Sequence, residues 1–106
     1  MIISTLRILT TPKSRAEIVR ILTAHLGPTR VQPGCLRCEL YRDVDDQSAI
    51  TWVEEWQSQA DMDLRLRSED YRIVLAAIEL ARETPVIHFD TVIRRWGLEV
   101  VVAARA

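Results

Sequence analysis

The spacing of hydrophobic and polar positions changes several times along the chain, and each change marks an expected element. Aliphatic and β-branched residues at positions 2–10 predict a first strand. Apolar positions then recur at helical intervals over residues 14–26, which predicts an amphipathic helix. Gly27 and Pro28 are expected to interrupt that helix, with at most one further turn before Pro33.

The second half of the chain alternates between short strands and helices. A polar run at 45–48 separates two strand patterns, which together predict a β-hairpin. Ser58 is a suitable N-cap for a short helix, and Pro85 ends the helix that follows it. The expected elements are strands at about 35–44 and 49–57, helices near 59–67 and from 68 to Pro85, and strands at 86–94 and 98–103.

This order of elements predicts one α+β domain over residues 1–106, a ferredoxin-like β-α-β-β-α-β fold with an extra C-terminal strand. One face of such a sheet packs on helices, but here the other face also carries apolar residues, such as Ile3 and Leu9. Because a lone domain would expose them, we expect two sheets to pack face to face in a homodimer. The strand at about 97–103 is expected to be exchanged or packed across that dimer.

The composition narrows the class of protein. Hydrophobic residues make up 48% and charged residues 27% of the 106 residues, a balance typical of a globular domain. The formal net charge of -1 lacks the basic surplus of a nucleic-acid-binding protein. No apolar run approaches the ~20 residues of a membrane span, and the N-terminus does not resemble a signal peptide. We therefore expect a cytoplasmic protein that binds neither nucleic acid nor membrane.

Cys35 and Cys38 form a C-x-x-C pair, a spacing found in redox and zinc sites. A zinc site needs two further ligands, and the chain's only histidines are His25 and His88. Residues three apart in a regular strand point to opposite faces, so the two sulfur atoms are not expected to meet. We expect two reduced cysteines that act as small apolar residues, and no metal.

Four short motifs resemble those of the antibiotic biosynthesis monooxygenase family, and the resemblance covers about residues 2–95. In order they are Arg30-x-x-Pro33-Gly34-Cys35-Leu36-x-Cys38-Glu39-Leu40, Glu54-Glu55-Trp56 before a helix, Leu66-Arg67-Ser68-Glu69-Asp70-Tyr71, and Pro85-Val86-x-x-Phe89. The resemblance implies a dimeric α+β barrel. It leaves the role open, since the family includes cofactor-independent oxygenases of phenols or quinols, haem-degrading enzymes, and members with no known activity.

The sequence departs from this family at two positions where many members carry histidine. Arg65 stands three residues before Ser68, and Asp70 stands two residues after it. The haem-degrading branch uses an asparagine together with a tryptophan and a histidine, and this chain contains no asparagine. We therefore expect neither haem nor a helix histidine that acts as a base.

Glu54 lies between Trp52 and Trp56 on one face of an expected strand, and this arrangement has two interpretations. In the first, the indoles hold a flat aromatic substrate and a buried Glu54 transfers a proton. In the second, the tryptophans are core or dimer anchors and Glu54 pairs with an arginine. The number of arginines in the chain favours the second slightly.

Four further residues are weighed in the same way. Arg65 either stabilises an anion at a pocket mouth or is a solvated charge on its helix. Tyr71 either reaches the pocket or is a buried structural residue. His88, the one strand histidine, is either the base or an interface residue. His25 is expected at a helix C-terminus, where a positive charge is favourable.

Two functions remain open from the sequence. The first is a monooxygenase without flavin, haem or metal, in which His88 or Glu54 removes a proton from a phenol or quinol, Arg65 stabilises the anion, and the anion reduces dioxygen. Trp52, Trp56 and Tyr71 would bind that substrate. The second is a non-catalytic dimer that binds a small apolar ligand or a protein partner.

Overall fold

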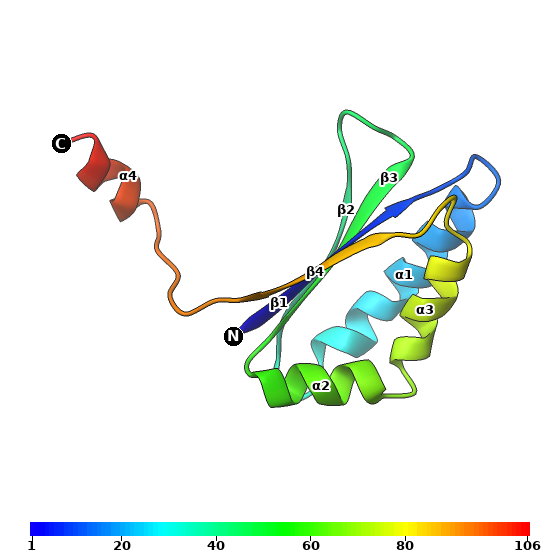
Figure 1. The fold of residues 1–106 in the computed structure, drawn as a ribbon, viewed down its shortest axis with the longest axis horizontal. Coiled ribbons are helices and arrows are strands. Elements are labelled where there is room, and N and C mark those ends of the chain that lie inside the picture. Colours follow the sequence, from blue (N-terminus) through cyan, green and yellow to red (C-terminus); the bar gives the residue numbers. More distant parts are fainter.

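The computed structural model describes residues 1–106, which form four strands and four helices (Figure 1). No helix is both long enough and apolar enough to cross a membrane. The elements are, in chain order, β1 (Ile2–Leu9), α1 (Arg15–Arg30), β2 (Cys35–Arg42), β3 (Ala49–Trp56), α2 (Gln59–Arg67), α3 (Tyr71–Glu79), β4 (Val86–Thr91) and α4 (Glu99–Ala104).

The four strands make one antiparallel sheet in the order β2-β3-β1-β4. Helices α1 and α3 lie side by side along one face of the sheet, and α2 crosses near one end of it (Figure 1). The ferredoxin-like α+β fold expected from the sequence is confirmed, with the second helical region divided into α2 and α3. The arrangement leaves the other face of the sheet without helices.

The main core lies between the sheet and helices α1 and α3. Alternation along β1 and β3 directs every second residue toward the helices, so opposite partners such as Leu6 and Trp52 meet on that face. The ten buried residues of this core are Leu6, Ile8, Ile18, Leu22, Cys38, Ile50, Trp52, Tyr71, Val74 and Ala77. A smaller cluster of Ile2, Trp56 and Met62 anchors α2.

Helix α1 continues through Gly27 and Pro28 to Arg30, so the expected interruption is wrong. A proline inside a helix removes one backbone hydrogen bond, but packing of the buried face can compensate. That face carries a stripe of Ile18, Leu22, His25 and Thr29 into the last turn. The following helix, α3, ends at Glu79, several residues before the expected stop at Pro85.

A β-bulge at the start of β2 corrects the expected orientation of the cysteines. The register shifts between Cys35 and Arg37, so Cys35 lies opposite Trp56 and Cys38 opposite Glu54. Both cysteines therefore lie on the helix-facing side, whereas Leu36 is exposed. Burial raises the pKa of Cys38 to about 12, which suits an inert core thiol.

The open face of the sheet is more polar than the sequence suggested. On this face Glu55 is buried between two arginines, with Arg37 donating to it at 3.2 Å and Arg95 at 2.8 Å. Arg37 also donates to the Tyr41 hydroxyl at 3.1 Å. Apolar residues such as Ile3 are interspersed among these groups, so the continuous apolar face is not found.

The C-terminal segment differs most from the sequence-based expectation. Strand β4 ends at Thr91, and residues 99–104 form helix α4 where a strand was expected. An unpaired strand would leave its backbone groups without partners, whereas a helix satisfies many of them internally. Helix α4 extends away from the domain at the end of a linking segment (Figure 1). All six of its residues are exposed within the chain.

Candidate functional site

A fully buried carboxylate, Glu54, organises the interior between β3 and the helices. The Trp52 indole donates to its Oε2 at 2.6 Å, and the Trp56 indole donates to its Oε1 at 2.9 Å. Alternation along β3 explains this geometry, because residues two apart share one face of the strand. Both tryptophans are thus core residues, and the indole N–H group of each donates to the Glu54 carboxylate.

Arg65 completes the coordination of Glu54 with two charge-assisted hydrogen bonds. Its Nε donates to Oε1 at 2.7 Å and its Nη2 donates to Oε2 at 3.0 Å, so the pair is bidentate. Both side chains are almost fully buried. Helix α2 delivers the guanidinium from its last turn, and the helix begins where Ser58 accepts from the Asp61 backbone N–H.

Helix α1 contributes the remaining polar partners of Arg65. Nη2 lies 3.0 Å from the Nε2 of His25 and donates to the Thr29 hydroxyl at 3.3 Å. The Thr29 hydroxyl donates in turn to the His25 carbonyl at 2.7 Å. Because arginine has only donors, this contact is a hydrogen bond in the neutral tautomer whose Nε2 accepts and whose ring proton is on Nδ1.

The environment keeps His25 neutral. Burial lowers its pKa below the ordinary value of 6.5, and the Arg65 guanidinium lowers it further, against smaller opposing effects of Glu54 and Asp70. The ring stacks on Trp52 with a centroid separation of 6.0 Å and an interplanar angle of 16°. A cationic ring would both repel Arg65 and lose its acceptor nitrogen.

One donor of Arg65 has no partner. Its Nη1 is buried and forms no hydrogen bond, and it is the only buried side-chain polar atom of the chain in that state. The guanidinium carbon lies 5.2 Å from the ring centroid of Tyr71 and 5.9 Å from that of Trp56. Burial raises the pKa of Tyr71 to about 12, so its hydroxyl stays protonated at neutral pH.

A hollow of about 300 Å³ adjoins this cluster. Arg65 and Trp56 form its inner wall, and α2 and the turn after α1 form its sides. Its lining combines apolar and polar side chains, namely Gln32, Pro33, Trp56, Asp61, Leu64, Arg65 and Ser68. The hollow is therefore where a small molecule could approach the free donor of Arg65.

The structure brings together five of the six site residues expected from the sequence. Trp52, Glu54, Trp56, Arg65 and Tyr71 meet in one cluster. Their interior is filled by Arg65, so the indoles enclose no open cavity. His88 lies elsewhere, because it pairs with Thr5 of β1 and shares the open face of the sheet.

Sequence reasoning missed His25 and Thr29, and it took Arg65 for a surface or pocket-mouth charge. His25 was expected to act as a cation at a helix end, whereas it is neutral and lies within α1. A signal was present: residues 18, 22, 25 and 29 recur at helical spacing, which places His25 and Thr29 on the buried stripe.

No group of three His, Cys, Asp or Glu side chains is arranged to hold a metal ion.

Replacing Glu54 with glutamine should destabilise the fold by roughly 3–5 kcal/mol, because it leaves the buried Arg65 charge uncompensated. Chemical denaturation should show this as a lower midpoint. The double variant Glu54→Gln/Arg65→Met should recover part of the loss, since it removes both charges from the interior.

The matched control is Glu55→Gln on the opposite face of β3. Glu55 is equally buried, but its partners Arg37 and Arg95 are 37% and 56% exposed and can turn toward solvent. A smaller loss of stability is expected for this variant. Equal losses for the two variants would contradict the special role of the Glu54–Arg65 pair.

The neutral state of His25 should make stability depend on pH. Because its folded pKa lies below 6.5, the unfolded chain binds more protons between these two values. The stability that the fold gains from a neutral His25 is present above the pKa of the unfolded chain. It is lost as pH falls through the pKa of the folded chain. Denaturation between about pH 7.5 and about pH 5 should show a shallower decline for His25→Gln than for the parent chain.

His88→Gln is the control, since His88 lies outside the buried network. This variant should decline as steeply as the parent chain. An unchanged slope in His25→Gln would show that His25 does not carry the effect.

Solved structures share this architecture. A protein of Deinococcus radiodurans, itself described by the antibiotic biosynthesis monooxygenase name, superposes with a TM-score of 0.83 at 18% identity, covering 92% of this chain and 97% of that one. Rv0793 from Mycobacterium tuberculosis gives 0.81 at 21% identity, with 91% and 98% covered. PA3566 from Pseudomonas aeruginosa gives 0.72 at 22% identity, with 90% and 94% covered. These likenesses establish the fold.

A search of curated protein sequences finds no match for the chain. A family model does match, over residues 1–77, and its description is antibiotic biosynthesis monooxygenase. The matched region contains β1 to β3 and the whole Glu54–Arg65 network with its partners on α1 and α3. The motifs that resembled this family in the sequence, the ferredoxin-like sheet and the family model agree, and the chain belongs to the antibiotic biosynthesis monooxygenase family.

Proposed function

We propose that this protein is a monooxygenase of a small aromatic substrate with an acidic hydroxyl, such as a phenol or quinol, and that the hollow beside Arg65 is its site. The observation that carries the proposal is the buried Arg65 Nη1, which has no partner inside the chain. A buried donor without an acceptor costs about 1–3 kcal/mol. An oxygen atom of a bound ligand would satisfy it.

The lining of the hollow suits a flat ring. Trp56, Pro33 and Leu64 offer apolar surface, while Arg65 offers a donor at the inner wall. The volume of about 300 Å³ is at the small end of ligand sites, which limits the substrate to one or a few rings. Because Nη1 is covered in the free chain, the wall has to open slightly when the substrate enters.

The proposed chemistry starts from the anion of the substrate. A guanidinium favours a phenolate over the neutral phenol, and burial strengthens this preference. Asp61 is the one carboxylate among the residues that line the hollow, and it would accept the proton. The electron-rich anion would then reduce dioxygen itself, as in the cofactor-independent members that the family includes. The substrate loses two hydrogen atoms and gains one oxygen atom to become a quinone, and the second oxygen atom leaves with those hydrogens as water. His88 has no part in this proposal, since it lies on the other face of the sheet.

A second function is favoured by a different observation. Both oxygens of Glu54 accept two hydrogen bonds each, and His25 Nε2 already faces Arg65. The cluster therefore holds no free base, unlike the usual arrangement of an acid–base enzyme. A non-catalytic protein that binds a small aromatic or apolar ligand in the same hollow would need none.

Oxygen uptake separates the two functions. Purified protein, without added cofactor, should consume oxygen with at least one member of a panel of hydroquinones and anthrone-like phenols. Leu64→Trp should reduce the rate at least about tenfold, because a larger side chain fills the hollow. Leu64 is 62% exposed, so the change should not disturb the core.

Leu75→Trp on α3 is the control, because Leu75 is also exposed and lies outside the hollow. It should behave like the parent chain. Saturable binding without oxygen uptake, lost in Leu64→Trp, would support the non-catalytic function. Neither binding nor uptake across the panel would contradict both.

We also infer that the chain forms a two-fold homodimer, as members of this family commonly do. The C-terminal segment carries large apolar side chains that the chain itself leaves exposed: Ile93, Trp96, Leu98, Val100, Val101 and Val102. Soluble proteins rarely leave so many apolar residues together in water. A second copy, contacted by this segment and by the open face of the sheet, would bury them.

Sedimentation should give a mass of twice 12.2 kDa at micromolar concentration. Val101→Glu should shift the population toward single chains, because a charge would become buried at the interface. Val44→Glu is the control, since Val44 is 96% exposed in the hairpin turn. A species of 12.2 kDa for the parent chain would contradict the dimer.

A further inference from the structure

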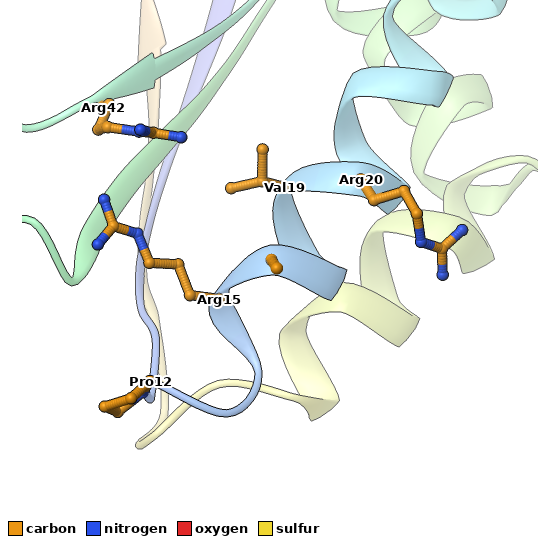
Figure 2. A pocket seen from close by; sticks show the side chains of 6 residues that line it. Pro12, Arg15, Val19, Arg20 and Arg42 are labelled. Carbon is orange, nitrogen blue, oxygen red and sulfur yellow. The ribbon is translucent and has the colours of Figure 1, made fainter.

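A second hollow, of about 410 Å³, lies between the N-terminal half of α1 and the end of β2 (Figure 2). It shares no residue with the hollow beside Arg65, which is near the other end of α1. Three of its six lining residues are arginines and none is acidic: the set is Pro12, Arg15, Ala16, Val19, Arg20 and Arg42. The positive charge of these arginines therefore favours a ligand with an anionic group.

Two of the arginines converge from different elements. Figure 2 shows Arg15 extending from α1 toward the sheet and Arg42 extending from β2 toward α1, while Val19 projects from α1 toward the same space. Arg20 points away on the other side of the helix. Arg15 and Arg42 therefore form the basic mouth of the hollow, whereas Arg20 also lines it but lies 3.8 Å from the carboxylate of Glu17.

The positive charge of this mouth is not neutralised within the chain. Neither Arg15 nor Arg42 takes part in any of the seven ion pairs of the structure. The nearest acid in sequence, Asp43, is directed elsewhere: it accepts from Arg7 at 3.4 Å and from the backbone N–H groups of Asp45 and Asp46. Two converging guanidiniums without a counter-charge attract an oxyanion.

The backbone adds to this preference. The hollow includes Ala16, in the first turn of the 16-residue helix α1. No side chain and no carbonyl group of the chain accepts a hydrogen bond from the N–H group of Ala16. Unpaired N–H groups at a helix N-terminus carry a partial positive charge. In this hollow, the partial positive charge of the Ala16 N–H group adds to the charges of Arg15 and Arg42.

An apolar hollow of about 120 Å³ adjoins the basic one. It shares Val19 and Arg42 with it and is otherwise lined by Leu40, Tyr41 and Ile50. A ligand whose anionic group contacts Arg15 and Arg42 would thus have room for an apolar body beside it. The two hollows together fit an amphiphilic ligand, because one offers a basic surface and the other offers an apolar surface.

We propose that this surface binds a small organic phosphate, with the phosphate on Arg15 and Arg42 and an aromatic or aliphatic group against Val19, Leu40 and Ile50. A phosphate monoester carries up to two negative charges and three terminal oxygens. That matches two guanidiniums and a backbone N–H group better than a carboxylate with one charge and two oxygens. The site is independent of the proposed reaction at Arg65.

The test is a titration of the isotopically labelled protein followed by amide resonances. Phenyl phosphate should shift the resonances of Ala16, Val19 and Arg42 saturably and bind more tightly than inorganic phosphate, because only the ester has an apolar body. Phenol, which lacks the phosphate, should leave these resonances unchanged. Arg15→Gln or Arg42→Gln should weaken the binding of phenyl phosphate at least about tenfold.

Arg72→Gln is the control, since it removes one exposed arginine of α3 that pairs with Glu69 and lies outside both hollows. It should bind phenyl phosphate like the parent chain. Equal losses in all three variants would mean that only net charge matters and would overturn the proposal. So would a lack of saturation, or equal affinity for phenyl phosphate and inorganic phosphate. The dispersion of the amide spectrum reports directly that each variant is folded.

Discussion

The ion pair between Glu54 and Arg65 constrains much of the interior. Two charges removed from water need nearly all of their hydrogen-bonding capacity satisfied, or the desolvation cost exceeds their attraction. The chain meets this demand with the indoles of Trp52 and Trp56 around the carboxylate and with His25 and Thr29 beside the guanidinium. These groups come from β3, α2 and α1, so one pair fixes how two helices sit over the sheet.

The same constraint shapes what the protein can bind. Because Arg65 fills the space between the tryptophans, a ligand cannot be sandwiched by the indoles and must approach from the hollow at the wall. Only Nη1 of the guanidinium is left for such a ligand. Helix α1 connects this region with the basic hollow at its other end, so one helix supports two separate surfaces with different chemistry. One combines apolar and polar side chains around a single buried donor, and the other carries the unpaired arginines Arg15 and Arg42.

Prediction from the sequence succeeded where a residue's neighbours along the chain decide its environment. Alternation along 50–56 placed Trp52, Glu54 and Trp56 on one face, and Ser58 caps α2 as expected. Prediction failed where the deciding partner is distant. Gly27 and Pro28 suggested a break, but the buried stripe of α1 continues to Thr29. The bulge after Cys35 became visible only through its pairing with β3.

The sequence by itself determined the order of elements up to β4, the helix-facing side of β1 and β3, and the family, because these depend on local spacing and short motifs. Only the tertiary structure decided the roles of the charged residues. Arg65 carries no sign in its own helix that it is buried, and Glu54 none that Arg65 is its partner. The pairing of Glu54 with Arg65 depends on which side chains α1, α2 and β3 bring within hydrogen-bonding distance. The two residues are eleven positions apart along the chain, so local spacing does not reveal it. The Val100–Val102 run likewise has the composition of a strand, but without a neighbouring strand its backbone is satisfied only as a helix.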